Sequence, residues 1–239
     1  MNREVEKLVL ELRQRIQQIR SFEATFTSVS HSELLPIDSH GTARFAAPDR
    51  FRTEAVMNGR RVITVRQGTL VETYLPDRRE AWRYDAKDLP AMLRPGREIL
   101  DTNDPFAWVQ EESLDSGGAL EIEGTEVYRF TAEGRRWADQ GVLDTRKGFS
   151  IPYRQKYPEM SMTLFVAATT GILRRRVVTD KAGKEMARLD FLVQAINVPL
   201  DEKLFRLEAP PDAFQRISLM DALAHSMDPD AADRPPSLN

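Results

Sequence analysis

The stretch Ser21-Phe22-Glu23-Ala24-Thr25-Phe26-Thr27 alternates apolar and polar residues, and it follows a segment with a different period. Phe22, Ala24 and Phe26 share one face of an extended chain, because successive strand side chains point to opposite faces. Within residues 2–20 the apolar residues instead recur at helical spacing: Val5, Leu8, Val9, Leu12, Ile16 and Ile19. The sequence therefore predicts one amphipathic helix that leads into a strand.

Turn residues divide much of the remaining chain into short alternating segments. Asn58-Gly59 is a strong two-residue hairpin signal, and Gln67-Gly68 is a weaker one. Segments 89–93 and 105–109 are short, apolar and poor in β-branched residues, so we expect short helices or turns there. After the strand at Phe22–Phe26, one predicted strand contains Ala43 and Phe45. The later predicted strands are 51–57, 61–65, 69–75, 80–84, 119–123, 126–131, 161–167, 171–179 and 185–194.

The order of these segments predicts the fold class. A sheet of about ten antiparallel strands twists too strongly to stay flat. We therefore expect an α+β fold, in which a curved antiparallel sheet forms an open half β-barrel that the N-terminal helix and short internal helices cover. Residues 1–217 are predicted to form one domain. A short helix and a disordered tail are expected in residues 218–239, because residues 228–236 are polar and rich in proline.

The composition excludes several classes of protein. With 239 residues, of which 41% are apolar, the chain is able to bury a sizeable core. Its net charge of −3 does not supply the positive field that nucleic-acid binding requires. No apolar run approaches the roughly 20 residues of a membrane helix, so no transmembrane segment is predicted. Residues 1–4 carry no apolar leader, so either a signal peptide was removed or the protein is not exported.

The search for catalytic or metal-binding motifs identifies none. The chain contains no cysteine, and its three histidines, His31, His40 and His225, lack metal-ligand spacing. No nucleophile elbow, phosphate-binding loop or dinucleotide fingerprint occurs. We therefore predict no catalytic residue, no metal, no cofactor and no enzymatic activity. The remaining enzymatic alternative rests on loop carboxylates alone: Asp104, Glu111 and Glu112.

The large apolar side chains are the remaining candidates for function. Most are expected to fill a core, and alternation by itself does not separate a filled core from a ligand cavity. A lipid-binding cavity would be lined by those on strands or near the short predicted helices, and an error of one residue in register would turn a candidate outward. The predicted lining residues are Phe26, Phe45, Phe51, Tyr74, Trp82, Met92, Leu93, Phe106, Trp108, Phe130, Phe165 and Phe191.

Five blocks in order resemble one family of proteins. Residues 21–27 are similar to a segment S-F-x-A-x-F-x, and residues 41–52 to G-x-L-x-x-x-x-P-x-x-F-R. Residues 67–76 resemble D-G-x-x-L-x-x-Y-x-P, residues 104–106 resemble T-P-F, and residues 204–211 resemble F-x-F-x-x-P-x-G. Together with the preceding helix, the resemblance covers roughly residues 2–216. They are typical of the LolA/LolB-like superfamily of periplasmic outer-membrane lipoprotein carriers.

The resemblance implies a monomeric periplasmic carrier that binds acyl chains of lipoproteins, or lipids, in an apolar cavity. Its partners would be an inner-membrane release transporter and an outer-membrane acceptor. The alternative function is a regulatory or adaptor module that resembles RseB and senses lipidated or misfolded ligands. Family members often carry an arginine before the proline of the second block, which helps to hold a lid closed. This chain has Ala47 there, so the latch does not transfer, and residues 137–160 have no counterpart in the short carriers.

Overall fold

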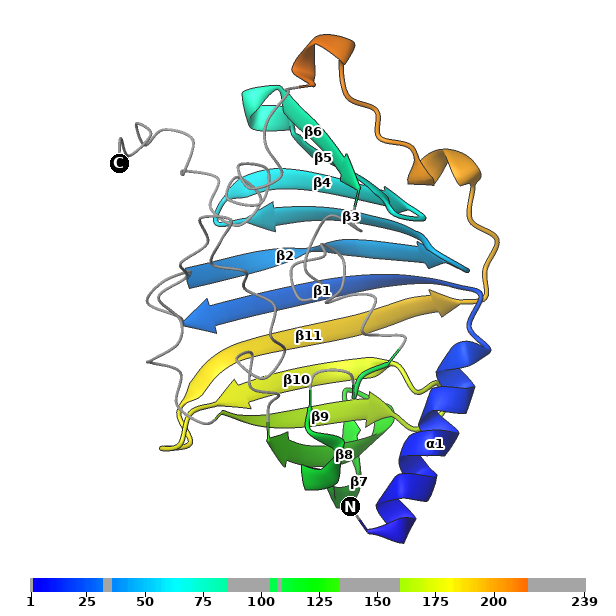
Figure 1. Cartoon of the computed structure of the whole chain (residues 1–239), viewed down its shortest axis with the longest axis vertical. Helices are drawn as coiled ribbons and strands as arrows, with labels where there is room; N and C mark the ends of the chain where they lie inside the picture. Colours follow the sequence, from blue (N-terminus) through cyan, green and yellow to red (C-terminus); the bar gives the residue numbers. More distant parts are fainter. Residues whose placement is uncertain (1, 32–35, 86–103, 107–108, 134–159, 215–239) are drawn as a thin grey trace, which may run out of the picture. The chain divides into compact units, whose positions relative to one another are not determined.

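The structure, a computed structural model, describes residues 2–31, 36–85, 104–106, 109–133 and 160–214 (Figure 1). These residues form one α-helix, α1 (Arg3–Gln17), together with eleven strands and short 3-10 helices. The strands are β1 (Ser21–His31), β2 (Pro36–Ala46), β3 (Arg50–Met57), β4 (Arg60–Gln67), β5 (Leu70–Leu75), β6 (Glu80–Asp85), β7 (Asp115–Ile122), β8 (Thr125–Glu133), β9 (Ser161–Ala167), β10 (Leu173–Thr179) and β11 (Glu185–Ile196).

The eleven strands form one antiparallel sheet. Their hydrogen-bonded order is β6-β5-β4-β3-β2-β1-β11-β10-β9-β8-β7, so β6 and β7 are the two edges and the sheet does not close on itself. This order confirms the predicted α+β class with one N-terminal helix and an open antiparallel sheet. The division of the chain into residues 1–217 and 218–239 stays a prediction, because residues 215–239 lie outside the described part.

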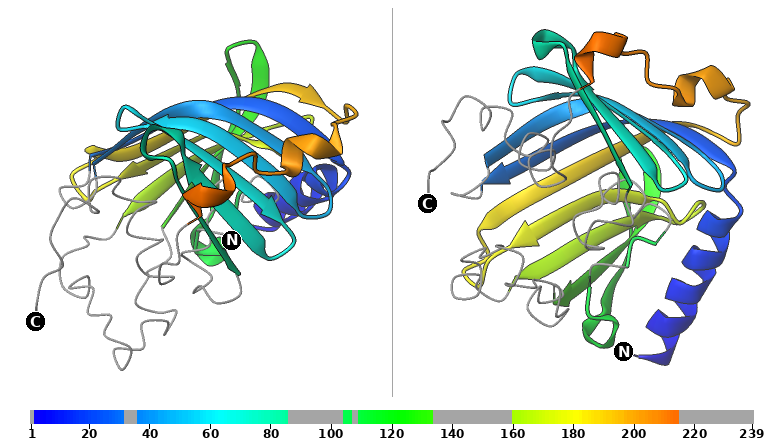
Figure 2. Two further views of the ribbon diagram at one scale, coloured as in Figure 1. Left: turned by 90° about the horizontal axis from the view of Figure 1, so that it is seen from above. Right: turned by 45° about the horizontal axis from the view of Figure 1, so that its top comes forward.

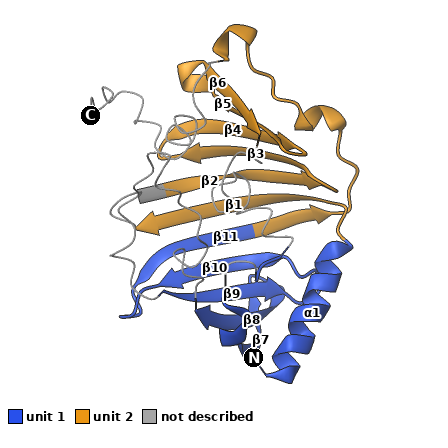
Figure 3. Cartoon of the chain, in the orientation of Figure 1, with its two compact units in different colours: residues 1–18, 99–191 blue, residues 19–98, 192–239 orange. Residues whose placement is uncertain are grey.

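The chain divides into two compact units (Figure 3). Unit 1 comprises residues 1–18 and 99–191, and unit 2 comprises residues 19–98 and 192–239. Strand β11 passes from unit 1 to unit 2 after Phe191. Each unit has a core of its own, and the two are described separately below.

In unit 1 the helix packs its apolar side against the protein. It begins at Arg3 because the side-chain oxygen of Asn2 accepts a hydrogen bond from the Glu4 N–H at 3.1 Å, as an N-cap does. The helix ends at Gln17, three residues earlier than predicted. Its buried residues are those that the helical period selected: Val5, Val9, Leu12 and Ile16.

Charged and aromatic contacts fix the helix within unit 1. The Arg13 guanidinium lies 3.0 Å from an Asp104 carboxylate oxygen and 2.8 Å from one of Glu111. It also lies 5.7 Å from the centroid of the Phe106 ring, and Phe106 meets Phe130 edge-on at 5.0 Å. Residues 105–106 form a turn where a short helix or turn was expected. The expected helix at 89–93 lies outside the described residues.

In unit 2 the strands follow one another as hairpins. The Asn58-Gly59 turn is confirmed, with φ angles of 49° and 81° that both fall in the left-handed region that two-residue hairpins need. Each hairpin keeps a regular register from β1 to β6. Rows of side chains therefore run straight across six neighbouring strands.

One face of the unit 2 strands is charged, and we call it the charged face. Arg52 and Arg61 donate to the Glu54 carboxylate at 2.9 and 3.2 Å, and Arg44 donates to Glu23 at 2.8 Å. The chain after β11 crosses part of this face (Figure 2). There it covers a small apolar cluster that includes Ala46, Ile63, Val65, Tyr74, Leu204 and Phe205.

Glu54 predicts a pH dependence of stability. Partial burial alone would raise the pKa of Glu54, but the hydrogen bonds and charges of the arginines around it lower that pKa below its ordinary value of 4.5. A carboxylate with a lowered folded-state pKa stabilises the protein above its unfolded-state pKa, and this contribution is lost as pH falls through the folded-state value. We therefore expect the stability advantage of the wild type over Glu54→Gln to be largest at neutral pH and to shrink below pH 4.5.

Urea unfolding at several pH values between neutral and acidic would measure this difference. Glu121→Gln, which neutralises an exposed strand carboxylate, is the matched control for the loss of one negative charge. An advantage over Glu54→Gln that stayed constant down to strongly acidic pH would contradict the assignment.

Candidate functional site

The other face of the unit 2 strands is largely apolar, and three rows of side chains define it. We call it the aromatic face. The first row is Phe22, Phe45, Phe51, Arg66, Val71 and Tyr84. The second row is Ala24, Ala43, Thr53, Thr64, Thr73 and Trp82. The third row is Phe26, Gly41, Ala55 and Val62.

Small side chains occupy the middle of this face. Phe22 and Phe45 stack with their ring centroids 5.4 Å apart, and with Phe51 they form an aromatic border over β1–β3. Next to this border lies a group of small residues that we call the floor: Ala24, Gly41, Ala43, Thr53 and Ala55. Gly41 has no room for a side chain, because a Cβ there would lie 2.2 Å from the Glu54 carbonyl oxygen. Small side chains thus lie beside a row of aromatic rings on this face.

The end of the face near β6 carries polar groups in apolar surroundings. Trp82 and Thr73 are each 1% exposed, and the Thr73 hydroxyl lies 3.3 Å from that of Thr64. The Tyr84 hydroxyl is buried and has no hydrogen-bond partner among the described residues. Burial raises the pKa of Tyr84, and the charge of Arg66 acts in the opposite direction. Tyr84 is therefore neutral at physiological pH and is able to donate a hydrogen bond.

Five of the predicted lining residues lie in the described part of unit 2, and four of them share the aromatic face. Phe45, Phe51 and Trp82 are buried there, and Phe26 is half-buried. Tyr74 lies on the charged face instead, where it pairs with Ile63 and packs against the Phe205 cluster. Alternation explains the difference, since Tyr74 directly follows the aromatic-face residue Thr73.

The predicted lining residues of unit 1 do not form one surface. Phe106 and Phe130 lie in the core of the unit, and Phe191 is also buried. Phe165 is on the opposite face from Phe130, since it pairs with Arg129 and Arg175. The other three predicted lining residues, Met92, Leu93 and Trp108, lie outside the described residues.

Tyr84, Thr73 and Arg66 belong to the site but were not predicted to line it. Tyr84 was recognisable in principle, because it stands two residues after Trp82 on the same predicted strand. Thr73 and Arg66 carry no such signal, since a threonine or arginine in a strand is usually placed at the surface. Only the register across β4, β5 and β6 brings them onto the aromatic face.

The described residues offer little for metal or membrane-spanning roles. Across residues 2–31, 36–85, 104–106, 109–133 and 160–214, no three His, Cys, Asp or Glu side chains are placed to hold a metal. In the same ranges no helix has the length and apolarity needed to cross a bilayer. Asp104 and Glu111, two of the loop carboxylates considered for catalysis, are both bound by Arg13.

Comparisons with known proteins find similarity in structure and not in sequence. No family model matches the chain, and no curated protein matches it. The structure is similar to an uncharacterised conserved protein from Thermus thermophilus, with 17% identity, a TM-score of 0.52 and coverage of 86% of this chain and 96% of that one.

Two mycobacterial structures are similar to the same degree. The lipoprotein LppX from Mycobacterium tuberculosis matches with 15% identity and a TM-score of 0.51, over 82% of this chain and 98% of that one. LprF from Mycobacterium bovis matches with 13% identity and a TM-score of 0.52, over 87% of this chain and 99% of that one. The chain therefore has the fold of LppX and LprF.

Proposed function

We propose that this protein is a non-enzymatic carrier that binds the acyl chains of a lipoprotein or lipid on the aromatic face of unit 2. The observation that supports this most is the floor of small residues beside the Phe22, Phe45 and Phe51 border. A linear acyl chain binds through apolar contacts along an extended surface of this kind. Its binding requires no covalent chemistry. The carrier would act outside the cytoplasm, in the periplasm, and take part in outer-membrane lipoprotein sorting.

The energy available from such a surface is adequate for reversible binding. Each buried methylene contributes about 0.8 kcal/mol, so ten of them supply roughly 8 kcal/mol before the cost of association. After that cost the affinity is moderate, and a carrier needs moderate affinity because it must also release its cargo. Release to an acceptor and loading from a membrane transporter are the partner interactions that the proposal implies.

The polar end of the aromatic face would hold the head of the ligand. Lipid-binding sites are mostly apolar with a few placed polar groups that fix orientation. The buried Tyr84 hydroxyl, with Arg66 in its row, provides such groups within one sheet. Ester or amide carbonyls, which every acylated lipoprotein carries, are acceptors that a neutral tyrosine hydroxyl would recognise.

The variant Tyr84→Phe should separate this role from a structural one. Removing a buried hydroxyl that has no partner among the described residues should leave the ligand-free protein as stable as the wild type, or more stable by about 1 kcal/mol. Binding of an acyl ester should weaken by about five- to tenfold, since one buried hydrogen bond is lost. Thermal unfolding and acyl-probe titration would measure the two effects.

Tyr74→Phe is the matched control, because Tyr74 lies on the charged face one strand away. It should leave acyl-ester binding unchanged. If both variants bind as the wild type does, Tyr84 does not contact the ligand.

Native mass spectrometry of protein purified without detergent would test the function itself. Organic extraction would then identify any lipid that co-purifies. Acyl-bearing lipid or lipopeptide at close to one per chain is the expected result. An empty protein that also fails to take up a fluorescent acyl probe would overturn the carrier proposal and favour the adaptor function.

A further inference from the structure

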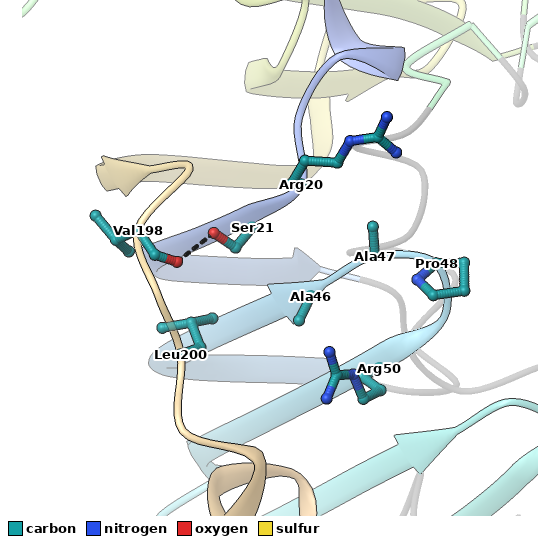
Figure 4. Close-up of a pocket in the computed structure, with 8 residues that line it drawn as sticks. All are labelled: Arg20, Ser21, Ala46, Ala47, Pro48, Arg50, Val198 and Leu200. Carbon is teal, nitrogen blue, oxygen red and sulfur yellow. Dashed lines mark hydrogen bonds between the residues drawn. The ribbon is translucent and has the colours of Figure 1, made fainter.

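A pocket lies in unit 2, away from the aromatic face (Figure 4). It is an open pocket of about 420 Å³, formed where the start of β1, the β2–β3 turn and the chain after β11 meet. Its lining residues are Arg20, Ser21, Ala46, Ala47, Pro48, Arg50, Val198 and Leu200. The size is within the range of small-molecule sites.

Hydrogen bonds join the three segments that form the pocket. The Ala47 N–H donates to the Arg20 carbonyl at 2.7 Å, which holds the β2–β3 turn against the start of β1. The Ser21 hydroxyl donates to the Val198 carbonyl at 2.5 Å (Figure 4). Asn197 adds two more links, since its side chain accepts from the Arg20 N–H and its own N–H donates to the Ser21 carbonyl. The pocket is therefore pre-formed.

Both ionisable side chains that line the pocket are arginines. The Arg20 guanidinium is exposed and makes no ion pair or hydrogen bond with any described residue, and it points away from Arg50 (Figure 4). Arg50 is held over the Phe205 ring, 5.4 Å from its centroid, and lies 3.1 Å from a carboxylate oxygen of Glu202. Glu202 is 80% exposed, so this ion pair is weak and a ligand anion is able to compete with it.

We propose that this pocket binds a phosphate ester, with Arg50 as one anion contact and the exposed Arg20 side chain, turned toward the ligand, as the other. Arginine presents a planar set of donors that matches phosphate oxygens, and it keeps its charge at all physiological pH values. Ala47, Pro48 and Leu200 offer an apolar wall for the organic part of the ligand. The ester is either a soluble organic phosphate or the headgroup of a phospholipid, which share this chemistry.

The pocket is distinct from the proposed acyl site. Ala46, which lines it, belongs to the apolar cluster of the charged face, and its strand neighbour Phe45 belongs to the aromatic face. Phosphate binding at Arg20 therefore does not depend on acyl binding. A variant that removes one function should leave the other intact, which makes the two proposals separable by experiment.

Calorimetric titration of the full chain with glycerol 1-phosphate and with a short-chain phosphatidylglycerol below its micelle concentration would test this site. Arg20→Met should weaken the binding of both probes by about tenfold, because a charge-assisted hydrogen bond is lost. Glu202→Gln should strengthen binding by about two- to fivefold, because the competing carboxylate is removed. Arg188→Met removes an exposed arginine of unit 1 and should leave binding unchanged.

Each outcome of this titration bears on the proposal. Tighter binding of the lipid than of glycerol 1-phosphate, with both sensitive to Arg20→Met, supports the site and assigns a lipid headgroup. Equal affinities with the same sensitivity support the site and assign a soluble phosphate. Absence of binding, or equal losses in Arg20→Met and Arg188→Met, would overturn the proposal. Acyl-probe uptake by Arg20→Met, which should equal that of the wild type, reports separately on the aromatic face.

Discussion

Replacing Gly171 by alanine should destabilise the protein by about 2–4 kcal/mol, the largest single-residue effect on stability that we expect. Gly171 lies in the turn between β9 and β10 with a φ of 74°, a conformation that is costly for any residue with a Cβ. A Cβ there would also lie 2.2 Å from the carbonyl oxygen of Leu12 in α1. The helix would have to move away from the turn, which would expose its buried side chains.

The melting temperature measures this effect, and it should fall by roughly 5–15 °C for a chain of this size. Gly183→Ala is the matched control, because Gly183 has a φ of 79° but no atom lies within 4 Å of the position that its Cβ would take. That variant should lose only the backbone component, about 1 kcal/mol. Equal losses in the two variants would show that the helix does not depend on close contact with the turn.

The regular parts of the fold were predictable because local patterns decide them. The helical period in residues 2–20 and the period of two after Phe22 each follow from which side chains must be buried. Segment 161–167 was predicted with the bounds that the structure shows. The Glu123-Gly124 turn between β7 and β8 was not singled out, although both residues have positive φ angles. Glu-Gly is a weaker hairpin signal than Asn-Gly, so this turn is recognised from the pairing of β7 with β8.

The site was predictable only in part, because a face is defined by register and not by residue type. Phe45 and Phe51 are directly paired, and both were correctly grouped by alternation along their own strands. Tyr74 and Phe165 are aromatic too, but Tyr74 lies on the charged face of unit 2, and Phe165 lies on the opposite face of its sheet from Phe130. The pocket at Arg20 had no sequence signal at all, since its three segments are far apart in the chain.

Filling the floor of the aromatic face should weaken acyl binding strongly, the largest functional effect that we expect. Thr53 is half-buried in the middle row, between Ala43 on β2 and Thr64 on β4. In Thr53→Trp the indole would occupy the space where the proposed acyl chain lies. Losing contact with about three methylenes costs roughly 2.4 kcal/mol, so the affinity for a fluorescent fatty acid should fall by about fiftyfold.

Thr42→Trp provides the matched control, because Thr42 lies on the charged face and pairs with Glu54, the neighbour of Thr53. Its melting temperature reports the cost of adding the ring, and its affinity for the probe should equal that of the wild type.

If Thr53→Trp does not fold, a single cysteine at either position is an alternative, because the chain contains no cysteine of its own. A polarity-sensitive dye on Thr53→Cys should respond to acyl ligand, while the same dye on Thr42→Cys should not. Equal responses from both positions would show that the ligand does not bind on the aromatic face, because Thr53 lies on that face and Thr42 lies on the charged face.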